Sequence, residues 1–141
     1  MAKWLDETIA VSPQISVAEI AEARENGIRM IVNNRPDGEQ PGQPTAAEIG
    51  EAAKAAGLGY VHIPVDHAGF SMEQVEAMTA ALAEPGPVLA YCRSGTRSTF
   101  LWALARGAAG DEPAEIAAKA ANAGYDVAPL LPMIESLRPK G

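Results

Sequence analysis

The segment CRSGTRS, which runs from Cys92 to Ser98, combines the residue types needed for nucleophilic chemistry on an anion. Cys92 supplies a thiol, and the thiolate form of cysteine is a strong nucleophile. Backbone N–H groups of a tight loop at the start of a helix bind anions, and Gly95 allows the loop to turn sharply. Arg97 adds a planar guanidinium that suits oxyanions. The segment therefore predicts covalent catalysis in which Cys92 attacks an anionic substrate.

Cys92 is the only cysteine of the chain, so no internal disulfide is expected. A single cysteine is more often a small buried hydrophobic residue. The catalytic interpretation is favoured here because an apolar strand precedes Cys92 and a glycine, an arginine and a helix follow it. Ser98 is expected either to hydrogen-bond the thiolate or to cap that helix. The following members of the segment are expected to bind the anion: Arg93, Ser94, Gly95, Thr96 and Ser98.

Three residues outside this segment are candidates for the same site. Asp66 is a carboxylic acid that would protonate a leaving group, although a role in the turn before the next helix explains it equally well. Arg35, with Asn34, follows a strand and would line the same crevice; the alternative is a solvated loop arginine. His67 would contact substrate, whereas a solvated turn histidine is the simpler interpretation. His62, flanked by apolar residues on a strand, is expected to be structural.

The composition of the 141 residues limits the classes of function. Hydrophobic residues make up 48% and charged residues 21%, which is typical of a globular protein with its own core. The formal net charge of −7 disfavours binding to nucleic acid. The histidines and the cysteine are too widely spaced for a metal site, and no nucleotide-binding motif is present, so no metal and no cofactor is expected. The chain lacks an apolar signal or membrane span, so we expect a cytoplasmic protein with no membrane partner.

Short apolar strands alternate with helices along the chain. The expected strands are 8–12, 28–32, 60–63 and 88–91. The expected helices are 17–26, 46–57, 72–83, 98–108 and 112–124, with a short one after Pro129, and the expected N-caps are Ser16, Thr45, Ser71 and Asp111. This order predicts one α/β domain, residues 1–141, with a mostly parallel central sheet flanked by helices. Ligands of such sheets bind beyond the carboxyl ends of the strands, and Cys92 follows one of those ends directly.

The segment CRSGTRS resembles the active-site loops of rhodanese-like sulfurtransferases and of cysteine-dependent protein tyrosine phosphatases. The phosphatases place five residues between the cysteine and the arginine. Here four residues separate Cys92 from Arg97, which is the rhodanese spacing. The stretch HIPVDHAGFSMEQV, in contrast, resembles the segment of dual-specificity phosphatases that carries the catalytic acid, and that resemblance implies this role for Asp66.

Most of the chain, from ISVAEI through IVNNRPDGEQP to AYCRSGTRS, resembles the bacterial beta-lactamase hydrolase-like, phosphatase-like domains. This resemblance implies a single domain with the fold of protein tyrosine and dual-specificity phosphatases. Some members of the family are fused to metallo-beta-lactamase-type sulfur dioxygenases and are regarded as sulfur transferases. The resemblance therefore also implies a sulfur dioxygenase-type partner.

The loop size favours sulfur over phosphate chemistry. A loop that is one residue shorter offers one N–H group fewer and encloses a smaller group, whereas phosphoryl transfer needs donors around three oxygens. We expect Cys92 to take sulfur from thiosulfate or another sulfane sulfur donor and to carry it as a persulfide. The alternative is a phosphatase that acts on a phosphate ester through a phosphocysteine, with Asp66 as general acid. A second alternative is an oxyanion- or sulfur-binding protein without turnover.

Overall fold

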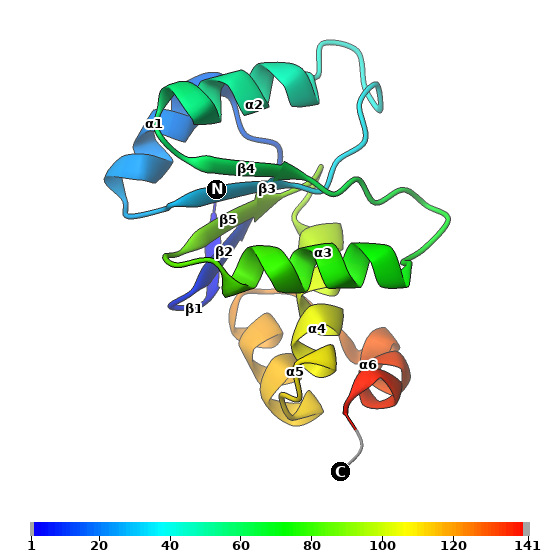
Figure 1. Cartoon of the computed structure of the whole chain (residues 1–141). Coiled ribbons are helices and arrows are strands. Elements are labelled where there is room, and N and C mark those ends of the chain that lie inside the picture. Colours follow the sequence, from blue (N-terminus) through cyan, green and yellow to red (C-terminus); the bar gives the residue numbers. More distant parts are fainter. Residues whose placement is uncertain (1, 140–141) are drawn as a thin grey trace.

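The computed structural model describes residues 2–139, and a five-stranded sheet lies at its centre (Figure 1). The strand order is β1-β2-β5-β3-β4. The strands are β1 (Lys3–Asp6), β2 (Ile9–Ser12), β3 (Met30–Asn33), β4 (Gly59–His62) and β5 (Val88–Tyr91). The last four run parallel, and β1 is antiparallel to β2. The predicted mostly parallel sheet is therefore confirmed. The predicted domain limits of 1 and 141 lie outside the described residues and stay a prediction.

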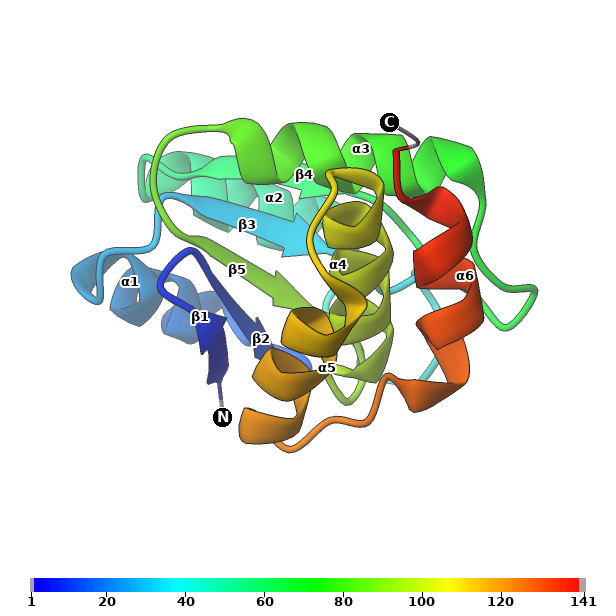
Figure 2. The ribbon, with the colours of Figure 1, turned by 90° about the horizontal axis from the view of Figure 1, so that it is seen from below.

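The helices cover both faces of the sheet. They are α1 (Val17–Glu25), α2 (Ala46–Ala55), α3 (Met72–Ala83), α4 (Thr96–Ala108), α5 (Pro113–Asn122) and α6 (Leu131–Leu137), the last preceded by the short 3-10 helix η1 (Ala128–Leu130). In Figure 1, α1 and α2 lie on one face and α3 to α6 on the other. Figure 2 shows α4 across the middle of the second face, between α5 and α6. The fold is thus a single three-layer α/β domain.

Capping signals in the sequence place the starts of three of the six α-helices in residues 2–139. Complete capping boxes begin α1, α2 and α3, with Ser16, Thr45 and Ser71 as the N-caps. Asp111 is not the N-cap of α5, which was the expectation. Its carboxylate instead accepts hydrogen bonds from Arg106 at 2.8 and 3.1 Å, and Glu112 precedes the helix. The stronger charge-assisted pair with an arginine outweighs the cap.

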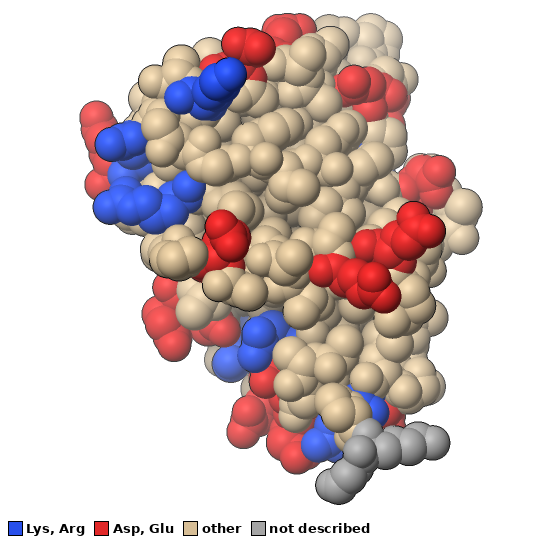
Figure 3. Space-filling model, viewed as in Figure 1, with Lys and Arg blue, Asp and Glu red and all other residues tan. Residues whose placement is uncertain are grey.

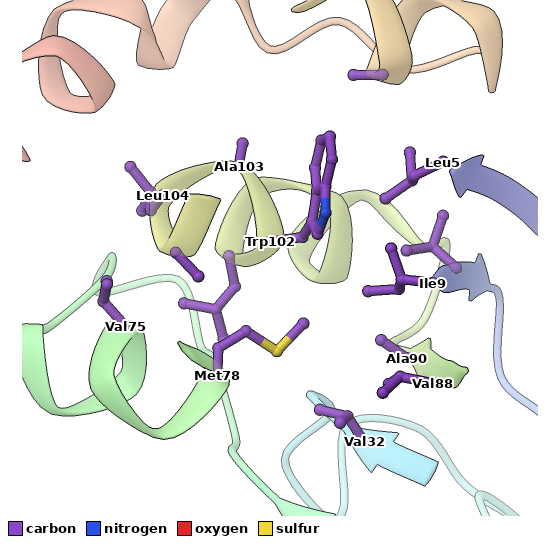
Figure 4. Close-up of a cluster of buried hydrophobic side chains, with 14 of the residues drawn as sticks. Leu5, Ile9, Val32, Val75, Met78, Val88, Ala90, Trp102, Ala103 and Leu104 are labelled. Carbon is purple, nitrogen blue, oxygen red and sulfur yellow. The ribbon is translucent and has the colours of Figure 1, made fainter. Parts of the chain in front are cut away.

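Two hydrophobic clusters hold the layers together. The smaller cluster joins α1 and α2 to the sheet through Ile20, Ile49 and Leu89. The larger cluster lies between the sheet and α3 to α6 (Figure 4). Its labelled members come from α4, α3 and the strands: Trp102, Ala103, Leu104, Val75, Met78, Leu5, Ile9, Val32, Val88 and Ala90. Helix α4 is therefore fixed at the centre of the molecule, and its N-terminus has a defined position relative to the sheet.

The parallel pairing brings the ends of four strands to one edge of the sheet. Ser12 pairs with Tyr91, Tyr91 with Asn33, and Asn33 with His62. The chain segments that follow these four residues therefore emerge side by side. They include the three segments in which the sequence placed its candidate residues. This edge is the predicted site of ligand binding.

The surface charges are unevenly distributed on the face that Figure 3 shows. A run of acidic side chains lies over α3, basic side chains gather at the upper left beside α1 and α2, and both kinds occur in the lower part of the view. Within residues 2–139, no helix has the length and apolar character needed to cross a bilayer.

Candidate active site

Cys92 lies at the junction of β5 and α4, as the sequence predicts. Its side chain is fully buried, and its Sγ accepts a hydrogen bond from the backbone N–H of Gly95 at 3.0 Å. The N–H of Cys92 itself donates to the carbonyl of Ser12 at 3.3 Å, which ties the loop to the end of β2. The loop thus curls so that a backbone N–H group points at the sulfur. A run of backbone N–H groups in such a curled loop can also bind an anion.

Helix α4 begins at Thr96, two residues before the expected start, and no side chain caps it. Its N-cap is Gly95 in the left-handed conformation, with φ of 90°. The first N–H groups of a helix have no partner within the helix, and they carry partial positive charge. Because the N–H of the N-cap Gly95 donates to Sγ, the helix N-terminus lies next to the thiol of Cys92. An anion at Cys92 is stabilised by the same groups.

Tyr125 packs against this loop, which sequence reasoning did not predict. Its hydroxyl donates to the carbonyl of Ser94 at 3.2 Å. A Cβ atom added to Gly95 would overlap the same hydroxyl. Burial raises the pKa of Tyr125, and the nearby charge of Cys92 raises it further. Tyr125 therefore supports the outer side of the loop and lies within electrostatic reach of the sulfur.

Gly95→Ala is expected to destabilise the fold more than Gly124→Ala, which serves as its matched control. Both glycines have positive φ, 90° at Gly95 and 93° at Gly124. A Cβ added at Gly124 meets no atom within 4 Å, whereas one added at Gly95 overlaps the Tyr125 hydroxyl. The left-handed conformation alone costs an L-residue about 1–2 kcal/mol, and the overlap with Tyr125 adds roughly 1–3 kcal/mol. Urea denaturation of the two variants measures the difference. Adding Tyr125→Phe to Gly95→Ala should recover part of the loss; equal effects of the two alanines would contradict the packing described here.

Arg97 is held by a carboxylate that the sequence did not single out. Its Nη1 donates to Oε2 of Glu39 at 2.8 Å and to the carbonyl of Val65 at 2.6 Å, and its Nη2 donates to Oε1 of Glu39 at 2.8 Å. The hydrogen bonds to Glu39 raise the pKa of Arg97, and the nearby charge of Cys92 adds to that increase. Arg97 therefore lies within electrostatic reach of Cys92, as the sequence predicts, and forms a bidentate pair with Glu39.

Arg35 is buried and contacts the same carboxylate. Its Nε donates to Oε1 of Glu39 at 2.9 Å, its Nη1 to Gln14 at 3.0 Å, and its Nη2 to Gln40 at 3.2 Å. Only 2% of its surface is exposed, so the expected alternative of a solvated loop arginine is wrong. The hydrogen bonds from Arg97, followed by the one from Arg35, lower the pKa of Glu39 to about 2. Glu39 is therefore ionised at neutral pH and joins the two arginines.

Ser98 neither caps α4 nor donates to the sulfur. It is buried, and its hydroxyl donates to Oδ1 of Asn34 at 2.8 Å. The amide of Asn34 in turn donates to the carbonyl of Ile63 at 3.0 Å. A serine hydroxyl has a single proton, so this bond uses its donor. Ser98 and Asn34 thus connect α4 to the segments that follow β3 and β4, and a direct contact of Ser98 with substrate stays a prediction.

Asp66 directly follows Val65, which is buried and whose carbonyl accepts a hydrogen bond from Arg97. The segment that carries Asp66 therefore reaches the candidate site. The side chain of Asp66 is exposed, and its Oδ1 accepts the N–H of Ala68 at 2.8 Å. This is the local turn contact that the sequence offered as the alternative to acid catalysis. His67 is exposed in the same turn. A chemical role for Asp66 or His67 stays a prediction.

The other predicted residues occupy the rim of the loop. Arg93 and Ser94 are exposed and Thr96 is half-buried, with the Ser94 hydroxyl donating to that of Thr96 at 3.1 Å.

His62 contacts the carbonyl of Arg35 through Nε2 at 2.9 Å, which is the structural role expected of it. Among residues 2–139, no group of three or more histidine, cysteine, aspartate or glutamate side chains could hold a metal ion.

Comparison with known proteins identifies the family of this chain. The family model described as "Beta-lactamase hydrolase-like protein, phosphatase-like domain" matches residues 2–110, which include the whole loop from Cys92 to Ser98. The chain belongs to this family. A beta-lactamase hydrolase-like protein of Agrobacterium fabrum is 37% identical to it over 101 residues, which are 71% of this chain and 23% of that protein. This chain therefore spans about a quarter of the length of the curated relatives it matches.

Solved structures similar to this beta-lactamase hydrolase-like domain have the protein tyrosine phosphatase fold. A structure from Neisseria meningitidis, assigned as a candidate phosphatase, has a TM-score of 0.79 and 35% identity, and the match covers 96% of this chain and 97% of that one. Tk-PTP in its active form has a TM-score of 0.74 at 20% identity, covering 96% and 95%. At that identity the second match shows the fold alone. The predicted family and fold are both confirmed.

Proposed function

We propose that this domain is a sulfurtransferase that carries sulfur as a persulfide on Cys92. With thiosulfate as donor, the Cys92 thiolate attacks the sulfane sulfur and forms a new S–S bond. The S–S bond of thiosulfate breaks, and sulfite leaves with the electron pair. An acceptor thiolate or cyanide then attacks the outer sulfur of the persulfide, and Cys92 leaves as the thiolate. Gly95 and the N-terminus of α4 stabilise the thiolate, and Arg97 binds the oxygens of the donor.

The observation that carries this proposal is the spacing of four residues between Cys92 and Arg97. In the structure, this short loop directs the N–H of Gly95 at Sγ from 3.0 Å. A shorter loop provides fewer N–H groups for the three oxygens of a phosphoryl group, but it suits a single terminal sulfur. Sulfite also leaves as an anion that needs no proton. The engagement of the Asp66 carboxylate by the N–H of Ala68 is consistent with a reaction that uses no general acid there.

The second candidate function is a cysteine-dependent phosphatase, and the comparisons favour it. The matched family is named phosphatase-like, and the Neisseria meningitidis structure is assigned as a candidate phosphatase. In this reaction Cys92 attacks the phosphorus of a small phosphate ester, and Asp66 protonates the leaving oxygen. Water then hydrolyses the phosphocysteine. Asp66 would carry the transferred proton on Oδ2, since Oδ1 accepts the N–H of Ala68.

Asp66→Asn separates the two functions. Sulfur transfer from thiosulfate to cyanide should stay within about twofold of wild type, because no step needs an acid; a phosphatase would lose roughly 10²- to 10⁴-fold in aryl phosphate hydrolysis. Both assays are run on both proteins, with Asp126→Asn as the control, since Asp126 also accepts a backbone N–H two residues ahead, at 2.9 Å. Aryl phosphate hydrolysis that depends on Asp66, without sulfur transfer, would refute the sulfurtransferase. Absence of both activities would support the binding protein without turnover.

The partner expected from the family resemblance stays a proposal as well. The curated relatives carry about three quarters of their length outside the matched region. We propose that a sulfur dioxygenase-type enzyme uses the persulfide sulfur that this domain carries. Persulfide consumption by such an enzyme, measured as loss of the Cys92 persulfide, would test the pairing once sulfur transfer is established.

A further inference from the structure

A groove of about 660 Å³ lies between β1 and α1, on the face of the sheet that α1 and α2 cover (Figure 1). Two helices lie over five strands on this face, which leaves room beside the edge strand β1. Among the described residues that line the groove, none is a predicted site residue. Small-molecule sites have volumes of about 300–1,000 Å³. The groove is therefore large enough for a ligand of its own.

Trp4 on β1 forms one wall of this groove. Leu5 packs into the larger hydrophobic cluster, and side chains alternate along a strand, so Trp4 points to the other face of the sheet. Trp4 is 47% exposed, although folded proteins bury most of the surface of a tryptophan. The floor of the groove is made of buried apolar residues: Ala10, Ile15, Ala23, Ile28 and Leu89. The groove thus offers an aromatic wall and an apolar floor to the apolar part of a ligand.

Helix α1 supplies an acidic wall. Glu19 and Glu22 are three residues apart on α1, so they share one face of the helix, and both line the groove. Oε1 of Glu19 accepts the N–H of Ser16 at 2.9 Å. Within residues 2–139, neither glutamate forms an ion pair, and no lysine or arginine lines the groove. A cation in the groove is therefore attracted by both carboxylates and by the ring of Trp4.

We propose that this groove binds a small organic cation, with its apolar body on the floor and its charged group between Trp4 and Glu22. Charge complementarity selects this class of ligand. The apolar floor favours an organic body over a simple metal ion, and the two glutamates favour a cation over a neutral or anionic compound. An anionic substrate of Cys92 is repelled here, so the groove is not an extension of the candidate active site. The proposal does not depend on the reaction that Cys92 performs.

Benzylammonium is the probe for this site, and benzyl alcohol, which has the same skeleton without the charge, is its control. The NMR signal of the Trp4 indole N–H reports binding, and that of the other tryptophan, the buried Trp102, is the internal reference. Trp4→Phe assigns the two signals. Benzylammonium should shift the Trp4 signal alone, with a Kd of about 1 mM, and benzyl alcohol should bind at least about fivefold more weakly. An unmoved Trp4 signal, or equal affinity for the two compounds, would overturn the proposal.

Glu22→Gln tests where the charge is recognised. It should weaken benzylammonium binding about two- to fivefold and leave benzyl alcohol binding unchanged. Glu25→Gln is the matched control, because Glu25 is exposed on the next turn of α1 and does not line the groove. Equal effects of the two variants, both shown to be folded by thermal unfolding, would overturn the proposal. A Trp4 signal that shifts when the protein concentration alone is raised would do the same, because a second copy would then cover the groove.

Discussion

Cys92→Ser is expected to abolish group transfer, with a loss of at least about 10⁴-fold in kcat/KM for whichever anion is the substrate. A serine hydroxyl is not ionised at neutral pH and cannot form a persulfide. Its oxygen can still accept the N–H of Gly95, which now lies 3.0 Å from the sulfur, so the loop has no reason to change. The assay is steady-state turnover with thiosulfate and with an aryl phosphate.

The control for this variant is its stability. Cys92 is fully buried, so a polar replacement could lower activity by disturbing the end of β5. Cys92→Ala tests this, because it has no polar group and should retain the fold with the same loss of activity. If either variant keeps more than about 1% of the wild-type kcat/KM while folded, Cys92 is not the nucleophile.

Arg97→Lys is expected to lower kcat/KM by about 10²- to 10³-fold, the range seen when a donor to a developing or bound oxyanion is removed. Lysine keeps the positive charge but is a point charge without the planar fork. It cannot make the two parallel bonds to Glu39, both 2.8 Å long, and present a second pair of donors to the substrate. The rate of Cys92 alkylation should change less than turnover, because the positive charge near the thiol remains.

Arg106→Lys is the matched control for this prediction. It disrupts a comparable pair, with Asp111 at 2.8 and 3.1 Å, at the other end of α4. We expect its kcat/KM to stay within about twofold of wild type, since its guanidinium is far from the sulfur. If Arg97→Lys behaves in the same way, charge alone suffices at position 97, and the fork geometry has no role.

Much of the fold follows from local sequence signals. The apolar run 88–91 is found as β5, and Ser16, Thr45 and Ser71 begin helices because their side chains satisfy N–H groups only three residues ahead. Strand β1 was not predicted, because only Leu5 among its four residues is buried and the apolar alternation of a strand is missing. Its pairing with β2 is a tertiary effect that no local pattern reveals.

In the candidate site, too, the sequence reveals residues that are close together in the chain and misses those that only the fold brings together. The sequence could place Cys92 and Arg97 in one candidate site because a single short segment carries both of them. Glu39 was missed because it lies in an irregular loop 58 positions from Arg97, and Tyr125 because it lies 31 positions from Ser94. The signal available for Glu39 was its charge: an acid beside Arg35 in a loop at the same edge of the sheet is a candidate partner for the site's arginines.

The intact mass of the protein after incubation with thiosulfate is the most direct test of the proposed chemistry. The account predicts a gain of one sulfur atom on wild type, reversed by cyanide or a thiol reductant and absent from Cys92→Ser. Incubation with an aryl phosphate should leave the mass unchanged and release no phosphate. An unmodified Cys92 after thiosulfate, together with a phosphorylated Cys92 or phosphate release from the aryl ester, would contradict the account and assign the domain as a phosphatase.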